Sequence, residues 1–228
     1  MKKTTINIFL LASALFYSFT SFSQWQQAAG TAGLNIQSLI TNGMYNFAGG
    51  STGAYLSTDN GGNYILSNKM DAAGLKFAES KAIATAFVSH KDFAGAVDPR
   101  RSFDEKVSEE IEKSGAQIVC LAGFMRLLSG WFVEKWFDKL INIHPSLLPE
   151  FKGADAVGDA MKAGAKISGC TVHFVREEMD SGPIIKQAQV EVSSDDTKET
   201  LAAKILEKEH DIYPKALKEV CEKIQKWH

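Results

Sequence analysis

From about residue 100 onward, hydrophobic and polar positions follow two alternating patterns. Phe103, Val107 and Ile111 recur at every fourth position among Glu and Lys residues, which predicts an amphipathic helix that ends at Gly115. The apolar run of residues 117–123 follows and is typical of a buried parallel strand. The same patterns predict helices over residues 131–137, 154–163 and 197–226, the last interrupted before Pro214, and strands over residues 139–144, 167–175 and 184–192. This alternation predicts an α/β fold with a mostly parallel twisted sheet flanked by helices.

The beginning of the chain has a different pattern. Lys2 and Lys3 precede an apolar stretch over residues 6–19, and a zone of small residues follows. This order of zones is typical of a secretory signal, and the apolar stretch is too short to span a bilayer comfortably. We therefore expect a signal-like segment over residues 1–23 and no stable membrane span. The alternative is that the apolar run over residues 6–11 is a buried N-terminal strand.

The next segment, residues 24–66, is rich in Gly, Ser, Thr and Asn, with scattered aromatic residues. Between residues 25 and 64 its one charged side chain is Asp59, a composition that favours β-hairpins over helices. Ser57, Asp59 and Gly61 are spaced as in the Asp-box repeat of secreted β-propellers, in which the carboxylate accepts hydrogen bonds from N–H groups of a turn. We expect a β fragment that packs on another part of the molecule, because one such repeat cannot bury its own faces.

Composition narrows the class of partner. The chain has 45% hydrophobic and 23% charged residues, with 25 Lys+Arg against 27 Asp+Glu, and it contains no basic run. This balance gives no reason to expect nucleic-acid binding and favours a small-molecule partner. Cys120, Cys170 and Cys221 lie 50 and 51 residues apart, which fits neither a disulfide framework nor a zinc site, so we expect reduced thiols.

Candidate chemistry lies at the end of the strand predicted over residues 139–144. Strand periodicity places Asn142 and His144 on one face, and Pro145 ends the strand, at the edge where open parallel sheets form ligand crevices. Asp180 lies in an acidic turn between two later strands. Taken one by one, these residues could also be a loop cap, a backbone hydrogen-bonding amide and a simple turn aspartate.

Four motifs, in the right order, carry a resemblance to a known family. The segments are residues 122–129, 141–149, 169–185 and 209–214. Together they resemble the phosphoribosylglycinamide formyltransferases, which are folate-dependent enzymes. The resemblance runs from about residue 67 to about residue 220, and we expect residues 67–228 to form the formyltransferase catalytic domain.

The resemblance implies a reaction. It is the transfer of a formyl group from 10-formyltetrahydrofolate to the amine of glycinamide ribonucleotide, in de novo purine biosynthesis, through a tetrahedral intermediate. Asn142 and His144 would donate hydrogen bonds to its oxyanion. Asp180 would favour the protonated imidazole and accept the proton that the amine loses. The implied mechanism needs neither a covalent nucleophile nor a metal.

The resemblance also implies binding residues, although the alternatives of surface ion pairs and plain core packing stay open for several of them. His173 matches a histidine common in the family, and we leave it outside the catalytic set. Contacts to the folate are expected from Arg100, Met125, Arg126, Leu127, Leu128, Asn142, Glu177, Glu178 and Met179, and contacts to the nucleotide substrate from Pro145 and Glu209.

The chain departs from the family at its beginning. The family starts with a strand and a glycine-rich loop whose N–H groups bind the substrate phosphate. Residues 30–40 echo such a loop, but a Gln-rich stretch precedes them where an apolar strand belongs. We therefore expect the first strand and the phosphate loop to be replaced, with weaker binding of the nucleotide than of the folate and an impaired activity.

Competing interpretations remain. A related formyltetrahydrofolate deformylase typically has a second His after the first, and the methionyl-tRNA formyltransferase an Arg-Gly after the loop, whereas residues 144–156 resemble the purine enzyme. In another class, the chain could be a secreted, non-catalytic β-repeat interaction protein with an inert formyltransferase remnant. The family implies a cytoplasmic protein, which conflicts with the signal-like segment over residues 1–23.

Overall fold

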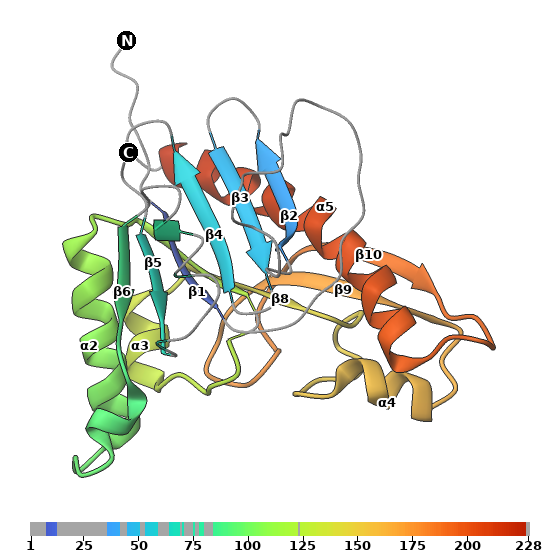
Figure 1. Cartoon of the computed structure of the whole chain (residues 1–228), viewed down its shortest axis with the longest axis horizontal. Coiled ribbons are helices and arrows are strands. Elements are labelled where there is room, and N and C mark those ends of the chain that lie inside the picture. Colours follow the sequence, from blue (N-terminus) through green and yellow to red (C-terminus); the bar gives the residue numbers. More distant parts are fainter. Residues whose placement is uncertain are drawn as a thin grey trace.

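The fold was analysed in a computed structural model. It describes residues 8–12, 36–41, 45–50, 53–58, 64–68, 70, 75, 78–79, 84–122 and 124–226. The helices are η1 (His90–Phe93, a 3₁₀ turn), α2 (Pro99–Lys113), α3 (Gly130–Lys135), α4 (Ala156–Lys162) and α5 (Lys198–Lys226) (Figure 1).

A mixed, mostly parallel sheet forms the centre of the molecule (Figure 1). Its strand order is β10-β9-β8-β7-β1-β5-β6. β9 is antiparallel to both of its neighbours, and the other pairs are parallel. The strands are β1 (Ile8–Ala12), β5 (Tyr64–Ser67), β6 (Ala84–Phe87), β7 (Ile118–Ala122), β8 (Leu140–His144), β9 (Ile167–Phe174) and β10 (Ile184–Glu191). The predicted fold class is confirmed.

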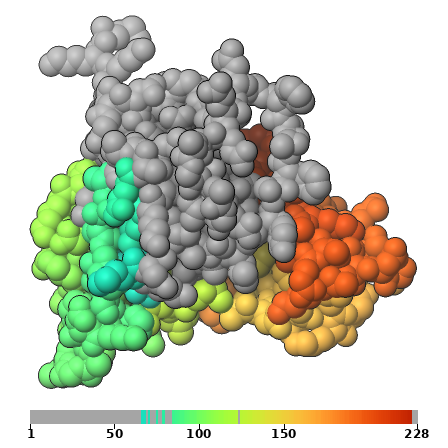
Figure 2. All heavy atoms as spheres, in the orientation of Figure 1, coloured from blue at the N-terminus to red at the C-terminus, as the bar shows by residue number. Residues whose placement is uncertain are grey.

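Alternate residues of β7 and β8 pack against different helices, because successive side chains of a strand point to opposite faces. Val119 and Leu121 join Leu140 and the apolar residues of α2 and α3 in one core cluster. Ile118 and Cys120 join Ile141, Ile143 and the apolar residues of α5 in a second cluster on the other face. In Figure 2, α2 (green) and the orange region that includes β10 lie at the two ends of the visible face. Since Asn142 alternates with Ile141 and Ile143, it lies on the face of α2 and α3.

The ends of α2 follow its sequence. Asp98 caps the helix by accepting a hydrogen bond from the Arg101 N–H at 2.9 Å, and Pro99 occupies the first turn, where its missing N–H costs nothing. Gly115 follows the helix with a φ of 69°, a left-handed conformation that glycine adopts readily, so the predicted stop at this residue is confirmed.

One predicted boundary is wrong. α5 runs through Pro214 as a single helix, whereas the sequence predicted an interruption before this residue. Proline disfavours a helix interior because it removes a hydrogen bond and clashes with the preceding turn. Buried residues on both sides of it, including Ile205, Ile212, Leu217 and Val220, pack on the sheet, and this packing outweighs the local cost.

The structure corrects the expectation for the beginning of the chain. β1 lies between β7 and β5 and is parallel to both, with Leu10 opposite Cys120 on one side and Ile65 on the other. A strand that pairs along both edges is an integral part of the sheet. Residues 8–12 therefore form the strand that was the alternative interpretation of this segment. The structure supports neither the signal-like segment nor the loss of the first strand. The rest of residues 1–23 lies outside the described residues.

Where the structure describes residues 24–66, they lie in β-strands, and β5 of this range belongs to the main sheet. A second, antiparallel sheet contains β2 (Ile36–Thr41), β3 (Tyr45–Gly50) and β4 (Gly53–Thr58), in that order. Asp59 and Gly61 of the Asp-box pattern, and residues 30–35 of the loop-like segment, lie outside the described residues. In the part of the chain that the structure describes, no helix combines the length and the apolar character that crossing a bilayer requires.

Candidate active site

β8 and β9 together position the polar side chains at the centre of the site. The two strands pair antiparallel, with Asn142 opposite His173 and His144 opposite Thr171. His144, Thr171 and His173 are buried, at 5%, 0% and 2% exposure, and Asn142 is half-buried. Buried polar side chains require partners, and these residues find them in one another and in the adjoining loops.

The loop after β8 is fixed by Thr171. Its hydroxyl donates to the Ser146 carbonyl at 2.6 Å and accepts from the Leu148 N–H at 3.0 Å. The Gln187 side chain donates to the same hydroxyl oxygen and to the Leu148 carbonyl. The chain that leaves His144 is therefore held on β9 and β10.

Asp180 reaches this centre from the turn between β9 and β10. It has a φ of 52°, and its Oδ2 accepts a hydrogen bond from the Gly153 N–H at 3.0 Å. The same oxygen lies 3.4 Å from Nδ1 of His144, and Oδ1 lies 3.7 Å from Nε2 of His173. The structure thus brings the sequence-predicted residues Asn142, His144 and Asp180 together, although Asn142 is connected to Asp180 through His173.

Both ring nitrogens of His144 face groups that accept hydrogen bonds. Nδ1 faces the Asp180 carboxylate, and Nε2 lies 2.9 Å from the carbonyl oxygen of Phe151. Since an ionised carboxylate and a carbonyl oxygen only accept, the ring satisfies both when it carries a proton on each nitrogen. This arrangement leaves His144 no spare N–H for an oxyanion until Nε2 leaves the Phe151 carbonyl.

His173 is a site residue that the sequence interpretation left out of the catalytic set. Its Nδ1 lies 2.9 Å from the Phe174 carbonyl oxygen, so this nitrogen carries the proton. Burial is the main cause that lowers the pKa of His173, and the neutral ring then presents the Nε2 lone pair to Nδ2 of Asn142, 3.4 Å away. The contact uses one N–H of the Asn142 amide and leaves the other for a ligand. In the sequence, the match of His173 to a histidine common in the family was the signal for this residue, and strand register then places it opposite Asn142.

The expected folate-binding residues after β7 divide into two groups. Met125 and Leu127 are 60% and 56% exposed, which excludes the alternative that they are plain core. Leu128 packs on the cluster formed by α2 and α3, as that alternative predicts. The guanidinium of Arg126 lies 5.3 Å from the centroid of the Phe103 ring, and Arg100 lies in the first turn of α2.

The acidic turn lies on another side of the site. Glu177, Glu178 and Met179 are exposed, and Glu178 pairs with Lys152 at 3.4 Å. The Glu177 carboxylate lies against Gly130, where a Cβ would be 3.0 Å from Oε1. The turn therefore approaches the beginning of α3, directly after the segment that contains Met125 and Leu127.

The two expected nucleotide-binding residues belong to different elements of the fold. Pro145 follows β8 directly and is half-buried. Glu209 belongs to α5, the helix on the face opposite Asn142, and its charge contributes to the raised pKa of Cys170. Burial raises the pKa of Glu209 to about 8.

The three cysteines are buried and free. Among the described residues, no group of three or more His, Cys, Asp or Glu is arranged to hold a metal ion.

Known proteins resemble this chain in sequence. The profile of the family described as Formyl transferase matches residues 35–217. Phosphoribosylglycinamide formyltransferase of Escherichia coli (strain K12) is 42% identical over 150 residues, which are 66% of this chain and 69% of that protein. The Trifunctional purine biosynthetic protein adenosine-3 of Gallus gallus is 47% identical over 157 residues, which are 69% of this chain. This chain spans 15% of the length of that trifunctional relative.

Solved structures resemble the fold as well. The crystal structure of phosphoribosylglycinamide formyltransferase from Anaplasma phagocytophilum matches with a TM-score of 0.64 and 45% identity, over 70% of this chain and 72% of that one. The enzyme of the same name from Brucella melitensis matches with a TM-score of 0.67 and 32% identity, over 94% of this chain and 95% of that one. The second likeness extends over nearly the whole length of both chains.

Proposed function

This chain belongs to the formyl transferase family, and on that premise we propose that it transfers a formyl group from 10-formyltetrahydrofolate to the primary amine of glycinamide ribonucleotide. The observation that carries the proposal is the contact of His144 with Asp180 at the carboxyl end of β8, beside the amide of Asn142. The three residues are the family set inferred from the sequence.

The reaction can be written with these residues in named roles. The amine nitrogen attacks the formyl carbon, and the carbonyl oxygen becomes an oxyanion. The free N–H of Asn142 donates to this oxygen, and the N–H at Nε2 of His144 adds a second donor once it leaves the Phe151 carbonyl. Asp180 accepts the proton that the attacking nitrogen loses, directly or through a water. When the intermediate collapses, its bond to N10 breaks, and N10 takes up the proton that Asp180 accepted, directly or through a water.

The ligands of the proposal are small molecules. Met125 and Leu127 offer exposed apolar surface to the folate, and Glu177 to Met179 would close on the pterin. Pro145 and Glu209 would contact the nucleotide. Because the purine intermediates and the folate donor are found in the cytoplasm, we propose that the chain acts there as an enzyme of purine biosynthesis.

A transfer assay with the full chain tests the proposal. 10-Formyltetrahydrofolate and glycinamide ribonucleotide are mixed with the protein, and the formylated ribonucleotide is detected by mass spectrometry. We expect the formylated amine and tetrahydrofolate in equal amounts. Free formate in place of the formylated amine would identify a deformylase, and no consumption of the donor would contradict the proposal.

Separate dissociation constants test the role of the beginning of the chain. The sequence departs from the family pattern at the expected phosphate loop, and a loop that lacks the backbone donors would weaken nucleotide binding far more than folate binding. Calorimetric titration with each substrate measures the two constants. An affinity for the ribonucleotide that equals or exceeds the affinity for the folate would show that other residues supply the phosphate site.

A further inference from the structure

A buried carboxylate on α2 has no part in the proposed reaction. Asp104 is 1% exposed, and burial is the main cause that raises its pKa. Burying a carboxylate costs free energy, and an apolar side chain of similar size at this place in α2 would avoid that cost. The carboxylate instead makes a specific contact with the segment that precedes α3.

Asp104 holds the end of the segment that follows β7. Its Oδ2 accepts a hydrogen bond from the Ser129 N–H at 2.5 Å, and the Ser129 side chain also hydrogen-bonds to the carboxylate. Ser129 is the N-cap of α3 and ends the segment of residues 124–129. One buried acceptor on α2 therefore fixes the point at which this segment enters α3.

The neighbouring residue of α2 holds the middle of the same segment. The Phe103 ring lies under the guanidinium of Arg126, at 5.3 Å from the ring centroid. Met125 and Leu127, on either side of Arg126, are mostly exposed, so packing in the core does not fix their positions. Phe124 and Leu128 of the same segment pack on the core cluster of α2 and α3, and the anchors at Arg126 and Ser129 add to this packing. Arg100 and Arg126 are the charged residues near Asp104.

We propose that Asp104 is a positioning residue that holds residues 124–129 in the conformation that binds the folate. The inference rests on the proposed function, because it takes this segment as part of the folate site. Asp104 acts through Ser129 and does not contact the ligand. Losing it should therefore weaken binding of the folate while the chemistry at Asn142, His144 and Asp180 stays the same.

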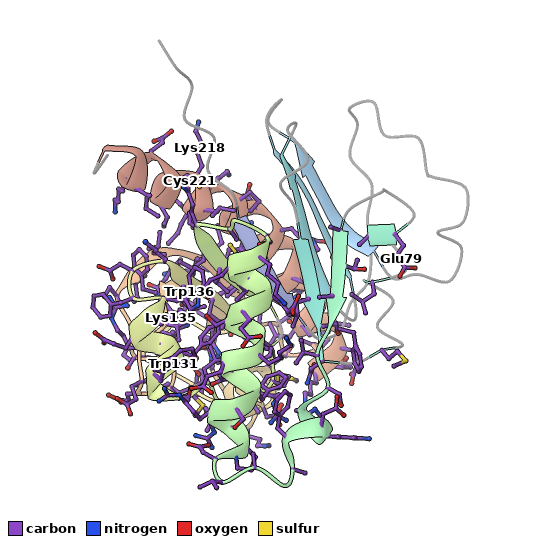
Figure 3. All side chains as sticks on the ribbon, turned by 90° about the vertical axis from the view of Figure 1, so that its left-hand side faces the viewer. Glu79, Trp131, Lys135, Trp136, Lys218 and Cys221 are labelled. Carbon is purple, nitrogen blue, oxygen red and sulfur yellow. The ribbon has the colours of Figure 1, made fainter. Side chains whose placement is uncertain are left out.

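The chain offers a matched control one helical turn away. Ser108 is fully buried on the same face of α2, and its hydroxyl oxygen accepts a hydrogen bond from Nε1 of Trp136 at 3.2 Å. Figure 3 shows Trp131 and Lys135 on α3, which lies beside α2, and Trp136 directly after α3. Ser108→Ala removes a buried contact between α2 and the end of α3 without touching residues 124–129.

The test measures binding directly, so that it does not depend on turnover. Tetrahydrofolate is titrated by calorimetry into the wild-type chain and into the Asp104→Ala, Asp104→Asn and Ser108→Ala variants. We expect Asp104→Ala to weaken the affinity about tenfold or more, as the loss of a charge-assisted hydrogen bond implies. Asp104→Asn keeps an oxygen acceptor and should recover most of the affinity, and Ser108→Ala should bind like the wild type.

A second variant cuts the contact from the other side and serves if Asp104→Ala does not fold. Ser129 has a φ of −72°, which proline accommodates, so Ser129→Pro removes the donor N–H without a change of φ, together with the hydroxyl that caps α3. It should weaken tetrahydrofolate binding as Asp104→Ala does. In steady-state assays, the variants should raise KM for the formyl donor and leave kcat within about threefold.

The outcomes separate the two proposals. A wild-type chain that does not bind tetrahydrofolate would overturn the proposed function, and the positioning role with it. A wild-type chain that binds, together with folded Asp104 and Ser129 variants of unchanged affinity, would overturn the positioning role alone. An equal loss in Ser108→Ala would also overturn it, because general packing between α2 and α3 would then explain the effect.

Discussion

At the scale of single residues, His173 determines how the Asn142 amide is presented. The Phe174 carbonyl fixes the proton on Nδ1, and the neutral Nε2 accepts from Asn142. Replacing His173 by Leu removes that acceptor and leaves the amide free to rotate. We expect kcat for formyl transfer to fall about tenfold or more, with little change in either KM, because a misdirected donor loses its effect in the transition state. Steady-state kinetics beside a thermal melt measures this, and unchanged kcat in a folded variant would exclude the role.

Glu209 should make the stability of the fold depend on pH. Its pKa in the folded chain is about 8, above the ordinary glutamate value, because of burial. Between the two values the folded chain keeps a proton that the unfolded chain has lost, so the free energy of unfolding decreases as pH rises toward 8 and levels off above it. Glu209→Gln cannot ionise and removes this loss.

From pH 5 to pH 9, we expect the free energy of unfolding of the wild type to fall relative to that of Glu209→Gln, by on the order of 2 kcal/mol or more. Urea unfolding at the two pH values measures the change. Glu207→Gln removes the same charge at an exposed position of α5 and should show no such difference. If the free energy of unfolding changed with pH by the same amount in Glu209→Gln and in the wild type, this carboxyl group would ionise normally.

The sequence predicted part of the site for a clear physical reason. Strand alternation and the terminating Pro145 placed Asn142 and His144 on one face at the end of β8, where the structure has them. Asp180 came only from the family motif, because its approach depends on a turn with positive φ, which periodicity does not report. The contacts of His144 with Phe151 and of Asn142 with His173 depend on loop closure and strand register, and hydrophobic patterns do not specify them.

At the scale of elements, the turn between β9 and β10 must fit closely to present Asp180. A Cβ on Gly182 would lie 1.7 Å from the backbone oxygen of Phe174, while the Phe174 N–H binds the Pro183 carbonyl at 2.9 Å. Gly182→Ala should therefore push the turn away from β9 and cost about 2 kcal/mol or more of stability. It should also lower formyl transfer, since Asp180 moves with the turn.

Thermal melts and transfer assays of Gly182→Ala measure both effects. Gly95→Ala is the control, because a Cβ at Gly95 has no heavy atom within 4 Å. Equal stability and activity in the two variants would show that the turn adapts freely.

The predicted helices and strands from residue 99 to residue 192 match the structure closely, because their hydrophobic periods are regular. The continuation of α5 through Pro214 depends instead on packing against the sheet.

At the scale of the whole molecule, the sheet depends on its first strand. A continuous apolar run is typical both of a secretory signal and of a strand buried on two sides, so sequence pattern alone could not separate the two. The ladders of β1 with β5 and β7 favour the strand. We propose that the catalytic unit includes β1 and β5 in addition to residues 67–228.

A chain that begins at residue 24 tests this organisation. Without β1, β5 and β7 lose their shared partner, and we expect aggregation or the loss of a cooperative melting transition. Leu10→Pro in the full chain should have a similar effect, because proline cannot donate in a central strand. Changing Lys2 and Lys3 to Ala should leave the melting temperature unchanged. A truncated chain that melts like the full one would restore the signal-like segment as the better interpretation.

The most direct test of the central claim is the rate of formyl transfer in variants of the contact between His144 and Asp180. kcat/KM is measured for the full chain and for His144→Ala and Asp180→Asn, with a melting curve for each. Transfer by the wild type and a loss of about 10²-fold or more in both folded variants would support the account, since His144→Ala removes a donor to the developing oxyanion and Asp180→Asn removes the acceptor of the amine proton. Turnover near the wild-type rate in either folded variant would contradict it.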